Sequence, residues 1–186
     1  METEQINNLS LKASELFVNG QYTEALKIYY TILATDLNNS SYNYNVGVIC
    51  SFLNDIELAV AFYKKAIRLD EKNIRAINNL ASLYVHRIKD FNIAAEYLDY
   101  VIKIAPNDPE AYNTYGNICL YKNDFEKAKL YLKKAIMLDE NYFGNHYDLA
   151  RAFIGLEQKT DAKKELKKCT KLNPNYKPAF ELLDSL

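Results

Sequence analysis

The stretch PEAYNTYGNICLYKNDFEKAKLYLKKAIMLDEN, residues Pro109 to Asn141, reads as two amphipathic helices joined by a short turn. In its first half, apolar residues recur at the three- and four-residue steps of one helical face, and a second such face begins at Phe125. Lys122-Asn123-Asp124 interrupts the apolar pattern between them. Asn tolerates the left-handed backbone that ends many helices, and Asp is a favoured N-cap. This tripeptide therefore predicts the turn.

The same unit occurs five times along the chain. Each copy carries one small residue in each predicted helix, at the place where two helix backbones cross closely. The small residues of the first helices are Ala13, Gly47, Ala81, Gly116 and Ala150, with steps of 34, 34, 35 and 34. Those of the second helices are Ala25, Ala59, Ala94, Ala128 and Ala162, with steps of 34, 35, 34 and 34. Two independent columns that keep one period indicate a repeat protein.

A helix–turn–helix unit with this period resembles the tetratricopeptide repeat (TPR) family. The resemblance covers roughly residues 6 to 175 and implies an all-α, right-handed α-solenoid. We expect five helix–turn–helix TPR repeats plus a C-terminal capping helix, which together form a single TPR domain over residues 1–186. The expected bounds are about 6–39, 40–73, 74–108, 109–142 and 143–175 for the repeats and 176–186 for the capping helix.

The sequence departs from the family pattern at several positions. The first repeat fits least well, because Lys12 takes a normally apolar position, and we expect this repeat to be the loosest. The third repeat has an extra residue in its inter-helix turn, Val85 to Phe91. The family's Trp in the first helix is absent from every repeat, where the residues are Leu9, Asn43, Ile77, Tyr112 and His146.

Composition excludes several classes of function. A formal net charge of −1 argues against a general nucleic-acid binder, which normally carries a clear basic excess. The first ten residues lack the apolar core of a signal peptide, and no apolar run approaches a membrane span. The three cysteines, Cys50, Cys119 and Cys169, are expected to be buried and reduced. We therefore expect a cytoplasmic protein with no nucleic-acid partner and no membrane insertion.

The sequence offers little catalytic chemistry. His86 and His146 are the only histidines, and neither has a second metal ligand at a useful helical spacing. His146 replaces a large packing residue and is expected to be partly buried, whereas His86 lies near an exposed turn. The chain has no Gly-rich phosphate loop, no CxxC and no HExxH. We predict that it is not an enzyme and has no cofactor and no metal site.

The two kinds of helix differ in charge. From the second repeat onward, the second helices carry most of the charged residues, which is typical of a solvated exterior. The first helices place Asn and Tyr at positions expected to be exposed. Asn suits a peptide backbone because it both donates and accepts, and Tyr gives contact area at low entropic cost. The predicted partner-binding residues are Tyr44, Asn45, Val48, Arg75, Asn78, Asn79, Ser82, Asn113, Thr114, Asn117, Tyr147 and Arg151.

The family resemblance points to the same face. In TPR proteins the first helices line a concave groove where peptides or partner helices dock, and Asn45 and Asn79 fall where related proteins present asparagine to a bound backbone. The alternative is that these asparagines are surface polar residues without a partner. The Lys-rich face of the fifth repeat is expected to be a solvated helix face, or else a site for an acidic partner or anionic surface; its residues are Lys163, Lys164, Lys167, Lys168 and Lys171.

These observations favour a non-catalytic protein–protein interaction scaffold that binds a peptide or helix of a partner protein in its groove. Two alternatives stay open: a dedicated chaperone or targeting factor for a secreted or assembling client, and a regulatory subunit of an enzyme. Self-association is possible as well, because the first repeat has no covering helix.

Overall fold

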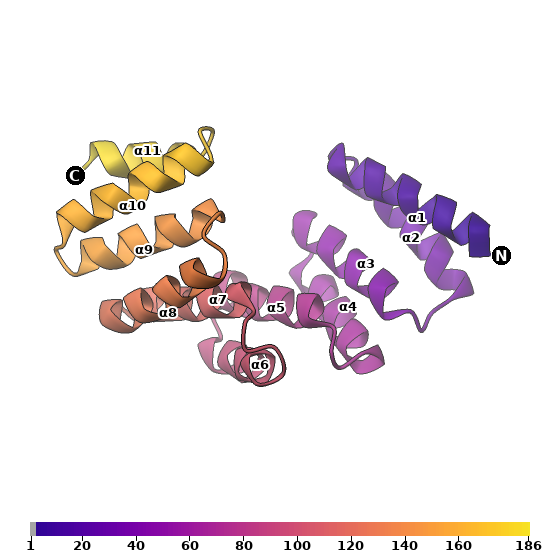
Figure 1. Ribbon diagram of the computed structural model, residues 1–186. Coiled ribbons are helices and arrows are strands. Elements are labelled where there is room, and N and C mark those ends of the chain that lie inside the picture. The colour runs from indigo at the N-terminus through magenta and orange to yellow at the C-terminus, as the bar shows by residue number, and fades with distance from the viewer. Residues whose placement is uncertain (1–2) are drawn as a thin grey trace. The chain divides into compact units, whose positions relative to one another are not determined.

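The computed structural model describes residues 3–186, and within them all regular structure is helical (Figure 1). The chain divides into two compact units, one ending at Lys89 and the other beginning at Asp90. The N-terminal unit contains α1 (Thr3–Val18), α2 (Tyr22–Thr35), α3 (Ser40–Phe52), α4 (Ile56–Leu69), α5 (Ile74–Leu83) and the short π-helix η1 (Tyr84–Ile88). The C-terminal unit contains α6 (Phe91–Ile104), α7 (Pro109–Tyr121), α8 (Phe125–Leu138), α9 (Phe143–Gly155), α10 (Lys159–Leu172) and α11 (Lys177–Asp184).

Polar caps define where most of these helices begin. Asp124 has its side chain positioned to accept a hydrogen bond from the backbone N–H of Lys127, which satisfies one of the orphan donors at the start of α8. Asp55 and Asp90 do the same for α4 and α6. The turns before these helices contain residues with positive φ, including Asn123 at 56° and Asn54 at 65°. The turn chemistry predicted from Lys122-Asn123-Asp124 is therefore present.

Within each unit, helices that follow one another in sequence pack against each other. In the N-terminal unit α3 also contacts α5, and in the C-terminal unit α7 contacts α9, so the first helices of successive repeats meet. The small residues lie at the crossings. A methyl group added to Gly116 would come 2.5 Å from Leu132 Cγ, and one added to Gly47 would come 2.7 Å from Tyr63 Cδ1. These two crossings leave no room for a larger residue.

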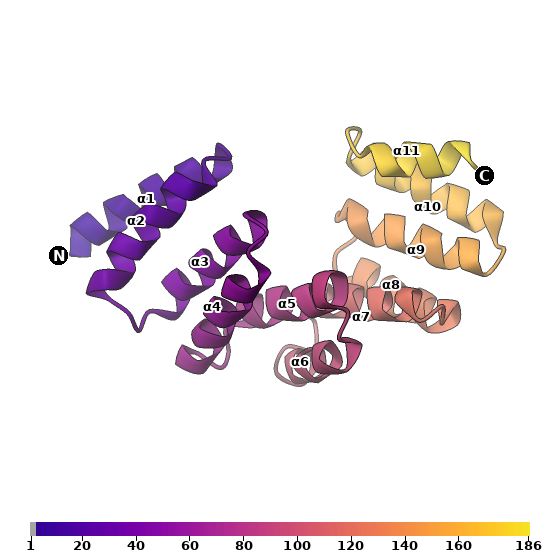
Figure 2. The ribbon, with the colours of Figure 1, turned by 180° about the vertical axis from the view of Figure 1, so that it is seen from behind.

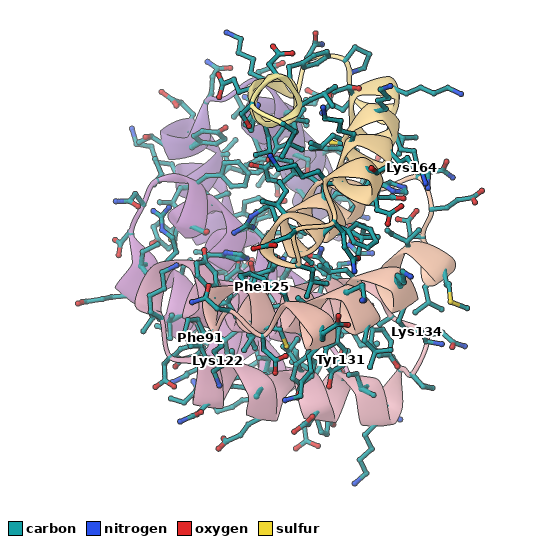
Figure 3. All side chains as sticks on the ribbon, turned by 90° about the vertical axis from the view of Figure 1, so that its left-hand side faces the viewer. Phe91, Lys122, Phe125, Tyr131, Lys134 and Lys164 are labelled. Atoms are coloured by element: carbon teal, nitrogen blue, oxygen red, sulfur yellow. The ribbon has the colours of Figure 1, made fainter. Side chains whose placement is uncertain are left out.

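The capping helix α11 lies along α10 (Figure 2). Ala179 of α11 is fully buried in the core of the C-terminal unit, and Tyr176, Leu183 and Leu186 pack against that core. At the other end of this unit, the ring of Phe91 stacks on Tyr121 with centroids 5.6 Å apart, and Lys122 lies 5.8 Å from the Phe91 centroid (Figure 3). The all-α fold of helix–turn–helix repeats with a capping helix is confirmed.

The extra residue of the third repeat lies in a π-helix. The five residues of η1 extend α5, and Lys89 then takes a left-handed conformation with φ of 66°. A π-turn takes up an inserted residue without ending the helix. The boundary between the two units lies directly after Lys89. The first helix of the third repeat therefore belongs to the N-terminal unit, and its second helix belongs to the C-terminal unit. The expectation of a single domain stays a prediction.

Helix α1 buries few of its side chains. Among the described side chains of α1, only Ala13 is buried, whereas Leu11 and Val18 are mostly exposed. No helix among residues 3–186 is both long and apolar enough to cross a membrane.

Candidate functional site

A cavity of about 220 Å³ lies in the N-terminal unit between the first helices of the first two repeats. Side chains from α1 and α3 form most of its wall, and Tyr29 reaches it from α2. Three of the predicted partner-binding residues, Tyr44, Asn45 and Val48, line it. The other lining residues, which the sequence did not single out, are Ser14, Phe17, Val18, Tyr29 and Ile49. We call this cavity the N-terminal groove.

One tyrosine hydroxyl organises the polar part of the N-terminal groove. Asn45 Nδ2 donates to the Tyr29 hydroxyl over 3.0 Å, and Ser14 Oγ lies 3.3 Å from the same oxygen. An amide has two N–H donors and an acceptor oxygen. Since only one Asn45 donor is used among the described residues, its Oδ1 and second N–H are available to a ligand. Tyr29 itself is almost fully buried, so its hydroxyl is held firmly in place.

The next first helix, α5, carries four more predicted residues, and they differ in exposure. Asn79 is half-buried and donates from Nδ2 to the Tyr44 hydroxyl over 3.2 Å, which links it to a residue of the N-terminal groove. Ser82 is half-buried and Arg75 is exposed. Asn78 is only 1% exposed, so the expectation of an exposed side chain is wrong there. The reason is that α5 is contacted by α3 and α4 and buries most of its circumference, including Ala76.

In the C-terminal unit the predicted residues Asn113 and Asn117 both donate hydrogen bonds to one carboxylate, which the sequence analysis did not identify. Asp148 Oδ2 accepts from Asn117 Nδ2 over 2.9 Å and from Asn113 Nδ2 over 3.2 Å, and its Oδ1 accepts from Arg151 Nη1 over 3.0 Å. Asn117 and Thr114 are each 3% exposed, so they too were wrongly expected to be exposed. Their burial follows from the contacts of α7 with α6, α8 and α9.

A signal for Asp148 was present in the sequence. Asp148 stands 34 residues after Thr114, and Thr114 stands 35 residues after Asn79 and 69 after Asn45. Asp148 therefore occupies the same repeat position as those asparagines. An acidic residue at a repeat position that is uncharged in the preceding repeats indicates that the polar chemistry of the first helix changes in the fifth repeat.

The predicted residue Tyr147 packs against an aromatic residue next to the capping helix. Its ring lies edge-on to Tyr176, with centroids 5.2 Å apart, and Tyr176 in turn contacts Phe143 with centroids 4.9 Å apart. Tyr176 directly precedes the capping helix α11. Tyr147 therefore helps to hold the cap in place.

The histidine that replaces a packing residue is buried more completely than the partial burial that we expected. His146 is 4% exposed; its Nδ1 lies 2.6 Å from Glu165 Oε2, and its Nε2 lies 3.1 Å from the carbonyl oxygen of Glu140. Burial opposes ionisation of Glu165, but the hydrogen bonds from His146 and Lys168 outweigh it and lower the pKa of that carboxyl. Among the described residues, no group of three or more His, Cys, Asp or Glu side chains is placed to hold a metal ion.

The three cysteines are buried and unpaired with one another. Burial raises the pKa of the Cys50 and Cys169 thiols to about 11, with the Asp55 and Asp148 carboxylates adding to the effect. These thiols serve the packing, as the sequence predicted.

Comparison with known proteins gives relatives of different sizes. The chain is 32% identical over 123 residues to the Photosystem I assembly protein Ycf3 of Rippkaea orientalis, a match that covers 52% of this chain and 71% of that protein. It is 29% identical over 102 residues to the general transcriptional corepressor trfA of Dictyostelium discoideum, of which it spans 7%. The fold is shared with PilF of Pseudomonas aeruginosa, at a TM-score of 0.81 and 17% identity, covering 95% of this chain and 80% of the other.

A family model decides the classification. The model described as "Tetratricopeptide repeat" matches residues 40–73, 74–108, 109–142 and 144–176, which is more than half of the chain. Together with the helix pairs and the close crossings at the small residues, this match supports a protein–protein interaction role of the kind that the fold implies. The chain belongs to the tetratricopeptide repeat family.

Proposed function

We propose that this protein is a non-catalytic adaptor that binds a segment of a partner protein in the N-terminal groove. The observation that carries the proposal is the cavity itself, in which apolar walls surround a fixed polar group. Phe17, Val48 and Ile49 supply apolar surface, while Asn45 is held by the Tyr29 hydroxyl and keeps an unused acceptor and donor. An apolar anchor side chain next to a peptide group is the ligand that such a site complements.

The size of the N-terminal groove favours an anchor residue over a small molecule. Small-molecule and cofactor sites usually begin at roughly 300 Å³. A cavity of about 220 Å³ is below that range and holds one or two side chains of a longer segment. The rest of the segment would then lie along the first helices, where Asn79 and Ser82 are half-buried and accessible.

Paired capture from a native lysate tests the proposal. Val48→Arg places a charge and a long side chain in the N-terminal groove, and Ala61→Arg makes the same charge change at an exposed position of α4. Both variants must first match the wild type in circular dichroism and thermal unfolding. We expect a partner to be retained by wild type and Ala61→Arg and lost from Val48→Arg. If both variants retain the same proteins, the N-terminal groove is not the binding site.

A second candidate function is an assembly chaperone, and one observation favours it. The relative from Rippkaea orientalis, at 32% identity, is named as an assembly protein. A chaperone keeps its client from aggregating, whereas an adaptor only brings partners together. The captured partner would therefore be diluted from denaturant with and without the purified chain, and light scattering recorded. Suppression at equimolar chain, lost in Val48→Arg, supports the chaperone; scattering that the chain does not change supports the adaptor.

A further inference from the structure

Helix α10 carries a concentration of positive charge in a chain whose net charge is −1. Its sequence KTDAKKELKKCTKL contains six lysines and only two acids. Both acids are already engaged within the C-terminal unit. Asp161 accepts from Lys164 over 3.1 Å, while Glu165 pairs with His146 and with Lys168, at 2.6 Å and 2.8 Å. The carboxylates of α10 therefore do not neutralise its remaining lysines.

Three of the remaining lysines face one cavity. The side-chain ammonium groups of Lys159, Lys163 and Lys167 make no ion pair or hydrogen bond with the described part of the chain, and these side chains line a recess of about 380 Å³. None of the described side chains around it is acidic. The recess, which we call the lysine recess, is completed by Thr160, Lys164 and Leu186, and Figure 3 labels Lys164 on α10.

The spacing of these lysines is unfavourable for the helix by itself. Residues four apart on a helix lie on the same side, so Lys159, Lys163 and Lys167 form one row. Like charges at this spacing destabilise a helix. An anion bound along the row would relieve this repulsion while it gained three charge-assisted donors.

We propose that the lysine recess binds an acidic segment of a partner protein. From Lys159 to Lys167 the helix advances by eight steps, or about 12 Å, which matches the length of about four extended residues. Lysine ammonium groups are mobile point charges with rotatable donors, and they suit several separate carboxylates better than one planar group. Lys164 also lines the recess, but its ammonium group is paired with Asp161, so the three-lysine row supplies the charge for the partner.

Other anionic partners fit the recess less well. Single-stranded nucleic acid is held by aromatic stacking as well as charge, and no aromatic side chain is among the lining residues. A membrane surface calls for an exposed apolar face beside the basic one, and only Leu186 is apolar here. The lysine recess belongs to the C-terminal unit and the N-terminal groove to the other, so the failure of one proposal leaves the other intact.

Titration with a defined peptide tests the proposal. A fluorescent peptide with a short run of glutamates, and a glutamine peptide of the same length, would be titrated with the full chain at low salt and at physiological salt. The test variant is Lys163→Gln with Lys167→Gln. The matched control is Lys103→Gln with Lys177→Gln, which removes the same charge at exposed positions of the C-terminal unit outside the recess and outside the row on α10. Lys and Gln have similar helix propensity, so folding is preserved.

We expect the glutamate peptide to bind wild type and control alike, to bind the test variant roughly tenfold more weakly, and to lose affinity as salt rises. The glutamine peptide should not bind. Equal weakening in both double variants would mean that only overall charge matters, and it would overturn the proposal. So would binding of inorganic phosphate or of phosphatidylserine vesicles without binding of the glutamate peptide, or dimerisation lost in the test variant alone.

Discussion

Asn117 Nδ2 donates a hydrogen bond of 2.9 Å to Asp148 Oδ2, from α7 to α9 across two successive repeats. The same oxygen also accepts from Asn113, and Arg151 holds the other carboxylate oxygen. Asn117 Nδ2 also donates to the backbone carbonyl and Oδ1 of Asn113, so its donors are already used within the unit, whereas Asn113 uses one amide hydrogen. A ligand that met this face would find an amide oxygen of Asn113 and a carboxylate that already accept hydrogen bonds. In the N-terminal groove, by contrast, the acceptor oxygen of Asn45 is unused.

Replacing Asp148 by Ala should destabilise the C-terminal unit by about 1–3 kcal/mol, because the buried amide of Asn117 would lose its charged acceptor. Urea unfolding of the chain measures this. The matched control is Asp161→Ala, which removes an exposed acid paired with Lys164 and should cost less than about 1 kcal/mol. Equal losses in the two variants would show that the Asp148 cluster adds no stability beyond an ordinary surface pair.

Glu165 should make stability depend on acid pH. The hydrogen bonds from His146 and Lys168 overcome the opposing effect of burial and lower the pKa of Glu165 below its ordinary value of 4.5. A carboxyl whose pKa is lower in the folded state stabilises the fold above its unfolded pKa. That contribution should therefore be present above pH 4.5 and lost as the pH falls from there through the folded pKa.

Urea midpoints measured from neutral to acid pH check this expectation, with Glu165→Gln as the comparison. The variant should be less stable at neutral pH and should lose less stability on acidification than the wild type does. Parallel curves for the two proteins would mean that Glu165 is not the group responsible.

The thiols should be protected in the folded chain. Because burial raises the pKa of Cys50 and Cys169 to about 11 and also raises that of Cys119, very little thiolate forms at neutral pH. Mass spectrometry after iodoacetamide treatment should find no alkylation in buffer and labelling at all three cysteines in denaturant. Rapid labelling of one cysteine in buffer would show that its surroundings open readily.

Gly116→Ala should destabilise the fold even though Ala favours helices. The new methyl group would lie 2.5 Å from Leu132 Cγ, and Leu132 is fully buried. Overpacking costs roughly 1–3 kcal/mol, and the gain in helix propensity returns just under about 1 kcal/mol. A net loss of up to about 2 kcal/mol is expected in thermal or urea unfolding. In a Leu132→Ala background the same substitution should be neutral or stabilising; an unchanged penalty there would point to a cause other than this contact.

The sequence by itself determined the repeats. Its period, the small residues at the crossings and the Asn and Asp residues in the turns set where helices begin, end and pair, because these are local properties of a helical face and a cap. It also predicted partial burial of His146, since that residue takes a packing position, and the structure buries it almost completely. The role of the twelve predicted partner-binding residues stays a prediction.

Only the tertiary structure decided how each side chain is used. Asn78, Thr114 and Asn117 are buried because neighbouring helices cover more of α5 and α7 than one apolar stripe suggests. Asp148 gathers two asparagines from another repeat, and the N-terminal groove includes Phe17 and Tyr29, which no repeat position marked as special. The physical reason is that helical periodicity fixes which residues share a face, whereas the packing of one helix on the next decides which of them touch, are covered or stay open to a partner.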